Sequence, residues 1–234
     1  MRPEDLVEFS RQTYAKQNNV KSWGRHDLVD SGLNSDETTL LEMVPLKHGK
    51  LLLLGVGGGR EAIPLARIGF NVTGVDFVPE AVQKARENAR KRGIEISGLV
   101  QEISMIDVPA GSYDIAWLSA DMYSCVPTRK RRIKMLKRIN KSLRHKGYFV
   151  CQFHWDTRLG FSRKAELARK AFAFLTLGNL WYEKGDMLWS NVEFIHAFSS
   201  TDELRSEFEA GGFELIHIHT PAESTSGGAV LKKA

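Results

Sequence analysis

Residues 51–76, LLLLGVGGGREAIPLARIGFNVTGVD, decide the fold of this 234-residue chain. The leucine run has the length of a strand, well short of the roughly 20 apolar residues of a membrane-spanning helix, and it predicts a buried parallel strand. The glycines that follow tolerate positive φ and let a ligand approach the backbone. A helix is predicted from near Arg60, and a second apolar run, Phe70 to Val75, ends in Asp76. Strand, glycine turn, helix, strand and acid together predict the nucleotide-binding half of a doubly wound fold.

Alternating strand and helix patterns continue after this unit. Pro79 begins the next predicted helix, and a basic helix from Arg129 is expected to end at His145-Lys146-Gly147, with its lysines and arginines on a solvated face. Further strands are predicted at Ile94–Val100, Tyr113–Leu118, Tyr148–Phe153, Phe213–Thr220 and Gly228–Leu231, the last one antiparallel. The predicted fold class is therefore α/β, with a doubly wound, mostly parallel sheet.

The remaining segments are placed around this core as parts of one domain spanning 1–234. Residues 1–50 form a helical preamble, residues 51–153 the cofactor-binding core, residues 154–200 an insertion after the fifth strand, and residues 201–234 the last helix and strands. The insertion is expected to hold a helix and a hairpin.

The preamble is predicted in more detail from its local signals. A first helix should break at Asn18-Asn19, and Trp23 to Asp27 should be a loop. Asn34 or Ser35 should cap a further helix. Tyr14 and Trp23 are expected either to border a ligand at the glycine turn or to lie in the core.

Composition excludes several classes of protein. With 42% hydrophobic and 26% charged residues the chain is typical of soluble globular proteins, and a net charge of +5 leaves nucleic-acid binding possible but not favoured. The two cysteines lack the spacing of a zinc site and favour a reducing compartment, and the N-terminal residues lack the apolar core of a signal peptide. We therefore expect a cytoplasmic protein with no membrane segment and no metal site.

The phase of the glycine turn distinguishes two kinds of nucleotide ligand. Gly57, Gly59 and Ala62 fit the dinucleotide fingerprint, but in that fingerprint the first glycine ends the strand, whereas here Gly55 does. No tyrosine has a lysine four residues later, so the proton-transfer pair of short-chain hydride enzymes is absent from the sequence. The phase argues against a dinucleotide.

At these residues the chain resembles the class I S-adenosylmethionine-dependent methyltransferases. Residues 51–86 are similar to their first two motifs, residues 112–123 (SYDIAWLSADMY) occupy the place of their fourth-strand motif, and residues 136–150 and 199–218 resemble their later helix and strand units. The resemblance covers residues 51–153 and 199–231. It implies a seven-stranded sheet with an antiparallel last strand, S-adenosyl-L-methionine as cofactor, and methyl transfer.

The resemblance also implies a role for particular residues. The backbone at Gly55, Gly57 and Gly59 would approach the methionine part of the cofactor, Asp76 would bind the ribose hydroxyls, Phe77 would pack on the adenine, Glu102 and Ile103 would lie at the adenine edge, and Ser119 would contact the amino-acid part. One position departs from the pattern: Leu53 stands where the family usually has an acid. Glu61 and Asp121 are the candidates to replace that acid.

Residues that follow the fourth and fifth strands are candidates for acceptor chemistry, because the carboxyl ends of parallel strands face the ligand. His154 is the preferred general base and Asp121 the second choice, with a structural role for His154 as the alternative. Tyr123, Trp155, Trp181 and Tyr182 are candidates for binding a partly aromatic small molecule.

The predicted function is methyl transfer to oxygen or nitrogen of a small molecule. RNA or protein is the alternative acceptor, suggested by the basic run from Arg129 to Lys146. A cofactor-binding module without catalysis is the non-enzymatic alternative, suggested by Leu53.

Overall fold

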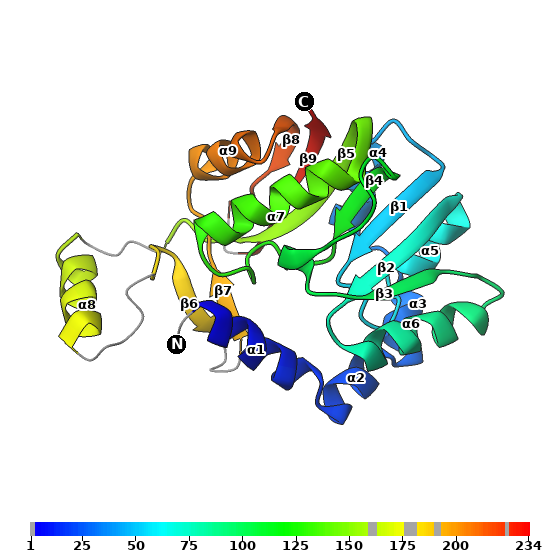
Figure 1. The fold of residues 1–234 in the computed structure, drawn as a ribbon, viewed down its shortest axis with the longest axis horizontal. Helices are drawn as coiled ribbons and strands as arrows, with labels where there is room; N and C mark the ends of the chain where they lie inside the picture. Colours follow the sequence, from blue (N-terminus) through cyan, green and yellow to red (C-terminus); the bar gives the residue numbers. More distant parts are fainter. Residues whose placement is uncertain (1–2, 159–162, 176–181, 190–192, 223–224) are drawn as a thin grey trace.

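The central sheet of the computed structural model contains seven strands among the residues that the structure describes, which are 3–158, 163–175, 182–189, 193–222 and 225–234. These strands are β1 (Gly49–Leu54), β2 (Phe70–Asp76), β3 (Ser97–Val100), β4 (Tyr113–Leu118), β5 (Leu143–Trp155), β8 (Phe213–His219) and β9 (Thr225–Lys233). Their order is β3-β2-β1-β4-β5-β9-β8 (Figure 1). β1 to β5 pair in parallel, and β9 runs antiparallel to both β5 and β8. The predicted doubly wound sheet with an antiparallel last strand is confirmed.

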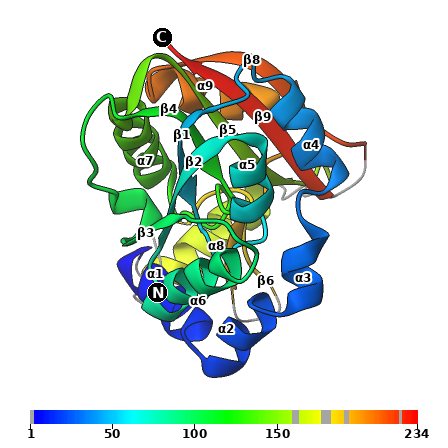
Figure 2. The same cartoon turned by 90° about the vertical axis from the view of Figure 1, so that its right-hand side faces the viewer.

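The leucines of β1 explain why this strand lies at the centre. All four are fully buried, and alternate side chains enter cores on opposite faces of the sheet. Leu52 and Leu54 pack with α7 (Arg129–Ser142) and α9 (Thr201–Ala210), whereas Leu51 and Leu53 pack with α4 (Ser35–Glu42) and α5 (Ala62–Ile68). Figure 2 shows these two helix layers with the sheet between them. A strand buried on both faces must be apolar throughout, as this run is.

The helices begin and end at residues with clear local reasons. Pro79 occupies the first turn of α6 (Pro79–Arg90), where its missing N–H costs nothing. Asn34 caps α4: its side chain accepts from the Glu37 backbone N–H, and the Glu37 carboxylate accepts from the Asn34 N–H, each at 2.8 Å. The predicted cap is thus confirmed at Asn34.

The N-terminal segment differs from the prediction. Asn18 and Asn19 lie inside α2 (Gln17–Trp23), which follows α1 (Pro3–Tyr14), so the predicted break there is wrong. The predicted loop from Trp23 to Asp27 is also wrong, because α3 (His26–Ser31) begins within it. Val29 of α3 is buried against α5 and α6, and this packing outweighs the weak helix propensity of the local sequence.

The basic helix ends earlier than predicted. α7 stops at Ser142, and β5 already begins at Leu143, whose side chain is fully buried and which pairs with Tyr113. The predicted helix end at residues 145–147 is therefore wrong, because a long-range pairing takes the chain into the sheet before the local stop signal. The local sequence around the end of the helix does not contain that pairing partner, Tyr113.

The insertion contains the predicted helix and hairpin. α8 is Arg163–Leu175, and β6 (Asp186–Trp189) pairs antiparallel with β7 (Glu193–His196) in a sheet of its own. α8 lies away from the central sheet (Figure 1), and Leu167, Phe172 and Phe174 are exposed on it. Within the described ranges, no helix has the length and apolar character that crossing a membrane requires.

Candidate functional site

The glycine turn lies where the strand order reverses. β1 has β2 on one side and β4 on the other, and the turn follows the carboxyl end of β1. Gly55, Gly57 and Gly59 have φ values of 84°, 49° and 96°, a region that favours glycine. Open α/β sheets bind their ligands outside the carboxyl ends of the strands at such a point. The predicted cofactor glycines are thus in the position that the fold class reserves for a ligand.

Asp76, at the end of β2, forms hydrogen bonds with the backbone of this turn and of the residues that follow it. One carboxylate oxygen accepts from the Gly57 N–H and the other from the Val78 N–H, each at 3.0 Å. Burial raises the pKa of Asp76, and these backbone donors oppose the rise. A carboxylate has about four acceptor positions, so two internal bonds leave capacity for further donors such as hydroxyl groups.

The glycines of the turn have different surroundings. A side chain at Gly57 would point into open space, with no atom within 4 Å, whereas one at Gly58 would meet the Trp23 carbonyl oxygen at 2.1 Å. A side chain at Gly55 would meet the Met122 sulfur at 2.1 Å. The turn is therefore closed at Gly58 by the N-terminal helices and open at Gly57.

Aromatic rings gather beside the open side of the turn. The Tyr14 ring lies 4.9 Å from that of Trp23 and 6.2 Å from that of Phe77, measured between centroids. All three side chains are partly exposed. The structure thus brings the predicted preamble aromatics to the residue predicted to pack on the adenine.

Glu102 has strong partners within the protein. Its carboxylate forms an ion pair with Arg131 at 2.6 Å and accepts from the Ser104 backbone N–H at 3.1 Å. Ile103 begins the short helix η1 (Ile103–Met105) and packs partly buried against the core. Glu102 therefore anchors α7 to the β3–β4 connection, which weakens the expectation that it accepts from a ligand's amino group.

Ser119 follows β4 directly across from the turn. Its N–H donates to Leu54 O at 3.0 Å, and its hydroxyl oxygen is buried with no hydrogen-bond partner among the described residues. Leu53 is fully buried in the core and offers no polar group to this edge. Glu61, a candidate to replace the missing acid, is buried beside Arg60, with 2.7 Å between their charged atoms. Burial raises the pKa of Glu61, while Arg60 opposes the rise.

Asp121 and His154 come together at the carboxyl ends of β4 and β5. Asp121 Oδ2 accepts from the Ser226 hydroxyl at 2.8 Å, and Ser226 pairs with His154 in the β5–β9 ladder. Burial raises the pKa of Asp121, while Ser226 and His154 oppose the rise. Asp121 Oδ1 and Gln152 Oε1 are buried without a hydrogen-bond partner in the described part of the chain. The predicted acid and base are thus neighbours in a polar group that sequence reasoning only half identified.

Two of the four predicted acceptor-binding residues, Tyr123 and Trp155, lie in the hydrophobic core. Tyr123 is fully buried, stacks on Phe198 and donates its hydroxyl to Glu207 at 2.6 Å, so it belongs to the core. Trp155 is 5% exposed and also packs in this core. Tyr182 is half-buried before β6, and Trp181 lies outside the described residues. The placement of Tyr123 and Trp155 argues against acceptor binding by either.

One arginine of the basic helix α7 is buried, although the sequence predicted that the lysines and arginines of this helix face solvent. Arg132 is fully buried, forms an ion pair with Glu207 of α9 at 2.7 Å and another with Glu183 at 3.1 Å. Its position shares a helical face with Met135 and Ile139, three and seven residues later, and this spacing was the available signal. The expectation that all the basic residues face solvent is wrong at this position, because acids on other elements compensate the charge.

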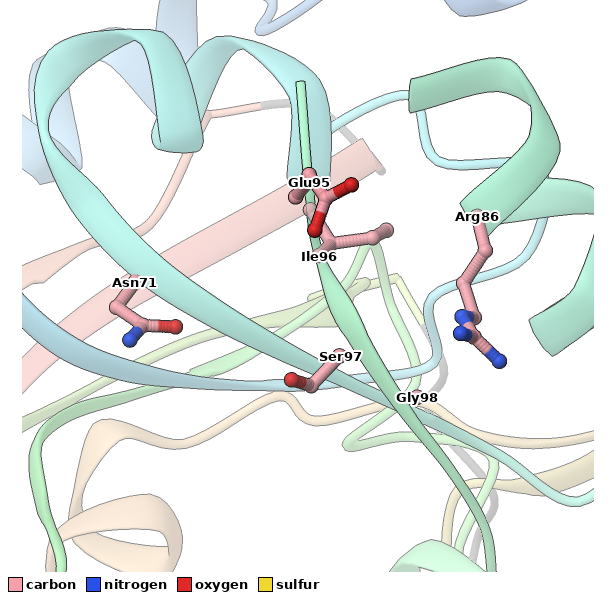
Figure 3. Close-up of a pocket in the computed structure, with 6 residues that line it drawn as sticks. All are labelled: Asn71, Arg86, Glu95, Ile96, Ser97 and Gly98. Atoms are coloured by element: carbon pink, nitrogen blue, oxygen red, sulfur yellow. The ribbon is translucent and has the colours of Figure 1, made fainter. Parts of the chain in front are cut away.

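A separate pocket lies at the opposite end of the strands from the glycine turn. It is lined by Asn71, Arg86, Glu95, Ile96, Ser97 and Gly98, near the amino ends of β2 and β3 (Figure 3). Ligands of this fold class bind at the carboxyl ends, so this pocket is not the candidate site.

Comparisons with known proteins agree with this geometry. Residues 51–147 match a family model described as a methyltransferase domain. A SAM-dependent methyltransferase structure from Methanosarcina mazei superposes with a TM-score of 0.65 at 20% identity, over 86% of this chain and 98% of that one. Residues 51–147 therefore match the methyltransferase domain family, and the chain has the fold of solved S-adenosylmethionine-dependent methyltransferases.

Curated relatives match over a shorter length. A ubiquinone biosynthesis O-methyltransferase from Methylocella silvestris is 36% identical over 70 residues, which are 30% of this chain and 27% of that protein. An S-adenosyl-L-methionine-dependent Diels-Alderase from Talaromyces variabilis is 32% identical over 94 residues, 38% of this chain and 32% of that protein. The chain thus spans about a third or less of the curated relatives it matches.

The methyltransferase domain matched by residues 51–147, together with the fold, implies S-adenosyl-L-methionine as the cofactor. The described residues fit that molecule. Gly57 opens onto free space, and Ser119 offers a buried hydroxyl that lacks a partner. An unpartnered buried polar atom is unfavourable unless water or a ligand bonds it, so this edge is suited to a polar ligand.

Proposed function

We propose that this methyltransferase moves the methyl group of S-adenosyl-L-methionine to a hydroxyl or amine of a small molecule. One observation carries the proposal. Asp121 and Gln152 carry buried oxygens without a hydrogen-bond partner among the described residues, and they come from β5 and from the residues that follow β4. Such a concentration of unsatisfied polar atoms is rare in a folded interior and marks a place where a ligand bonds.

The proposed cofactor contacts divide between backbone and side chains. The backbone at Gly55, Gly57 and Gly59 borders the methionine part, with Ser119 donating to its amino-acid end. Asp76 accepts from the ribose hydroxyls with the lone pairs that Gly57 and Val78 leave. Phe77, with Tyr14 and Trp23, packs on the adenine, and Ile103 with Glu102 lies at its outer edge. When bound, the cofactor supplies a methyl group already activated by the positive sulfur.

The chain's part in the reaction is to hold the acceptor and remove its proton. His154 is the proposed base, and the Asp121 carboxyl group lies beside it. Ser226 fixes the Asp121 carboxylate. A base of this kind suits a hydroxyl acceptor, and the relatives named O-methyltransferases favour oxygen over nitrogen.

A nucleic-acid acceptor is less well supported. Arginines of the basic run are engaged within the protein: Arg131 with Glu102, Arg132 with Glu207 and Arg138 with the Ile106 carbonyl oxygen. Engaged guanidinium groups are not available to phosphates. The cytoplasm remains the proposed location, since neither Cys125 nor Cys151 forms a disulfide in the described part of the chain.

Two measurements test the proposal. Calorimetry should detect binding of S-adenosyl-L-methionine and not of NAD; binding of NAD alone would overturn the cofactor. Incubation with methyl-labelled cofactor and a panel of hydroxyl and amine metabolites should then transfer label. Cofactor binding with no labelled product from any acceptor would favour the non-catalytic module, which Leu53 suggests.

The general base is tested by His154→Gln, which keeps a polar side chain and removes the basic nitrogen. We expect kcat on a hydroxyl acceptor to fall by about 10²- to 10⁴-fold, with cofactor affinity unchanged. His219→Gln, on the exposed edge of β8, is the matched control and should be neutral. An unchanged kcat in His154→Gln would assign this histidine a structural role.

A further inference from the structure

The β6–β7 hairpin carries a group of polar side chains that methyl transfer does not use. Glu183, Asp186 and His196 each offer one ligand atom, and these atoms all lie within 4.8 Å of one another. Asp186 and His196 are direct partners in the antiparallel ladder, so their side chains share one face of the hairpin. Glu183 is held close because its backbone N–H donates to Asp186 Oδ2 at 2.7 Å. Three side chains are thus brought to one point by backbone geometry.

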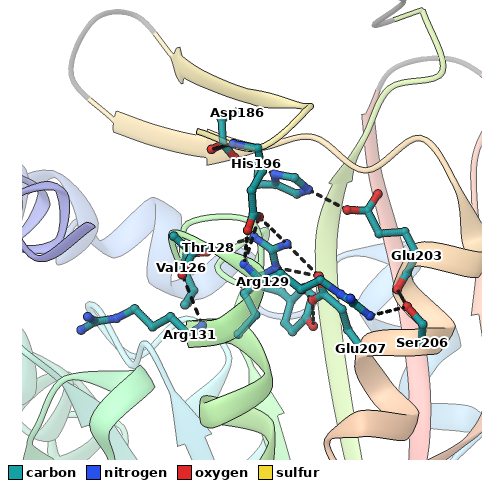
Figure 4. Close-up of polar contacts among 12 residues, drawn as sticks. Val126, Thr128, Arg129, Arg131, Asp186, His196, Glu203, Ser206 and Glu207 are labelled. Carbon is teal, nitrogen blue, oxygen red and sulfur yellow. Dashed lines mark hydrogen bonds and ion pairs between the residues drawn. The ribbon is translucent and has the colours of Figure 1, made fainter. Parts of the chain in front are cut away.

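The His196 ring is oriented as in a metal centre. Its Nδ1 faces Asp186 Oδ1 at 2.7 Å, and its Nε2 faces the Glu203 carboxylate of α9 at 3.3 Å (Figure 4). Histidines that bind metals commonly donate their other ring N–H to a carboxylate, which fixes the ring and strengthens the ligand. Glu203 supplies such a partner, leaving Nδ1 toward Asp186 and Glu183.

Asp186 is a buried carboxylate whose negative charge must be compensated. Its side chain is 2% exposed, and its partners among the described residues are the Glu183 N–H and the His196 ring; no guanidinium or ammonium group bonds it. A buried carboxylate is unfavourable unless it is paired or coordinates a metal. A proton on His196 or a metal ion at Nδ1 satisfies this requirement.

We propose that Glu183, Asp186 and His196 bind one divalent transition-metal ion, with Glu203 holding the His196 ring. One imidazole nitrogen and two carboxylate oxygens are a ligand set that Zn²⁺ accepts, with water in the fourth position. The Glu183 side chain is 29% exposed and gives the ion a path from solvent. Glu183 also accepts from the Arg129 backbone N–H at 2.7 Å and pairs with Arg132 at 3.1 Å, so the metal would share this carboxylate with those donors.

The ion would join the hairpin to α9. His196 and Asp186 belong to β7 and β6, and Glu203 belongs to α9, which packs on the central sheet. A metal bound there stabilises the folded arrangement by mass action, independently of cofactor or acceptor. The proposal therefore stands apart from the methyl-transfer function.

The test uses the full chain, stripped of metal with a chelator and titrated with Zn²⁺ in a calorimeter. We expect one ion per chain and a higher melting temperature with Zn²⁺ present. Asp186→Asn and His196→Gln should abolish binding, Glu203→Gln should weaken it by about 10- to 100-fold, and His219→Gln should leave it unchanged.

A second measurement needs no variant. Co²⁺ added to the wild-type protein should give the visible absorption of a tetrahedral or five-coordinate N/O site, and Zn²⁺ should remove it. No stoichiometric binding by the wild type would overturn the proposal and assign His196 as an imidazolium held between Asp186 and Glu203. Binding that survives in folded Asp186→Asn, or that is lost in His219→Gln, would also overturn it.

Discussion

Asp76 combines two tasks at the end of β2. Its carboxylate fixes the glycine turn through the Gly57 and Val78 N–H groups, and it is the proposed acceptor for the ribose hydroxyls. Its conformation is therefore set before a ligand arrives. A residue that both shapes and lines a site should affect stability and binding together when it is removed.

Asp76→Ala tests this double role. We expect the free energy of unfolding to fall by about 1–3 kcal/mol, because two N–H groups lose their acceptor in a buried position. Affinity for S-adenosyl-L-methionine should fall as well. Urea unfolding and calorimetry measure the two effects, with Asp107→Ala, an exposed acid, as the control. Stability equal to that of the control would contradict the structural task.

Glu61 provides a prediction about pH. Burial raises the pKa of Glu61 above the usual 4.5, so the folded protein holds this proton more tightly than the unfolded chain does. The resulting stabilisation is present below about pH 4.5 and is lost as the pH rises through the folded-state pKa. In Glu61→Gln this dependence is absent.

The measurement is urea unfolding of wild type and Glu61→Gln at a series of pH values from about 4 to about 8. The stability of the wild type relative to the variant should decrease as the pH rises. Glu80→Gln, an exposed residue of α6, should show no such trend. If the free energy of unfolding changed with pH in the same way for wild type and Glu61→Gln, this prediction would be wrong.

At the scale of elements, the N-terminal helices and the glycine turn depend on each other. The Trp23 carbonyl at the end of α2 lies 2.1 Å from where a Gly58 side chain would begin. α2 can approach the turn this closely because residue 58 is glycine. In the same arrangement Tyr14 packs against both Trp23 and Phe77.

Gly58→Ala should therefore push α2 away from the turn. We expect faster proteolysis within residues 1–31, followed by mass spectrometry, and weaker cofactor binding. Gly111→Ala is the matched control: its φ of 61° makes alanine cost about 1–2 kcal/mol, but the side chain would meet open space far from α2. Equal proteolysis of this segment in both variants would show that α2 is not held by the turn.

At the scale of the whole molecule, Arg132 joins three parts of the chain that are distant in sequence. From α7 it contacts Glu207 of α9 and Glu183 before the hairpin, and its guanidinium lies 5.1 Å from the Phe198 ring centre. Tyr123 donates to the same Glu207. Removing one member leaves an uncompensated buried charge, which costs more than the pair itself contributes.

Arg132→Ala should accordingly lower the free energy of unfolding by about 3–5 kcal/mol, whereas Lys130→Ala, exposed on the same helix, should be near neutral. The double variant Arg132→Met with Glu207→Gln should recover much of the loss, since no lone charge remains. Chemical denaturation checks all three. A double variant no more stable than Arg132→Ala would contradict this account of the network.

The sequence determined the fold class and the glycine turn because their signals are local. A four-residue apolar run, glycines in a fixed phase and an acid after the next apolar run are contained in residues 51–76. The Asn34 cap and the β6–β7 hairpin were predictable for the same reason. Even the inward position of Arg132 was present in the spacing to Met135 and Ile139.

Only the tertiary structure decided which polar groups meet. Ser226 reaches Asp121 because β9 lies beside β5, and Tyr123 enters the core because Glu207 of α9 accepts its hydroxyl. Glu183, Asp186 and His196 meet through a hairpin register, and Glu203 joins them from another element. The Asp121–Ser226 and Tyr123–Glu207 pairs join residues 105 and 84 positions apart along the chain, and the hairpin cluster depends on strand register and on the packing of α9. No local window encodes them, because burial and strand order fix them.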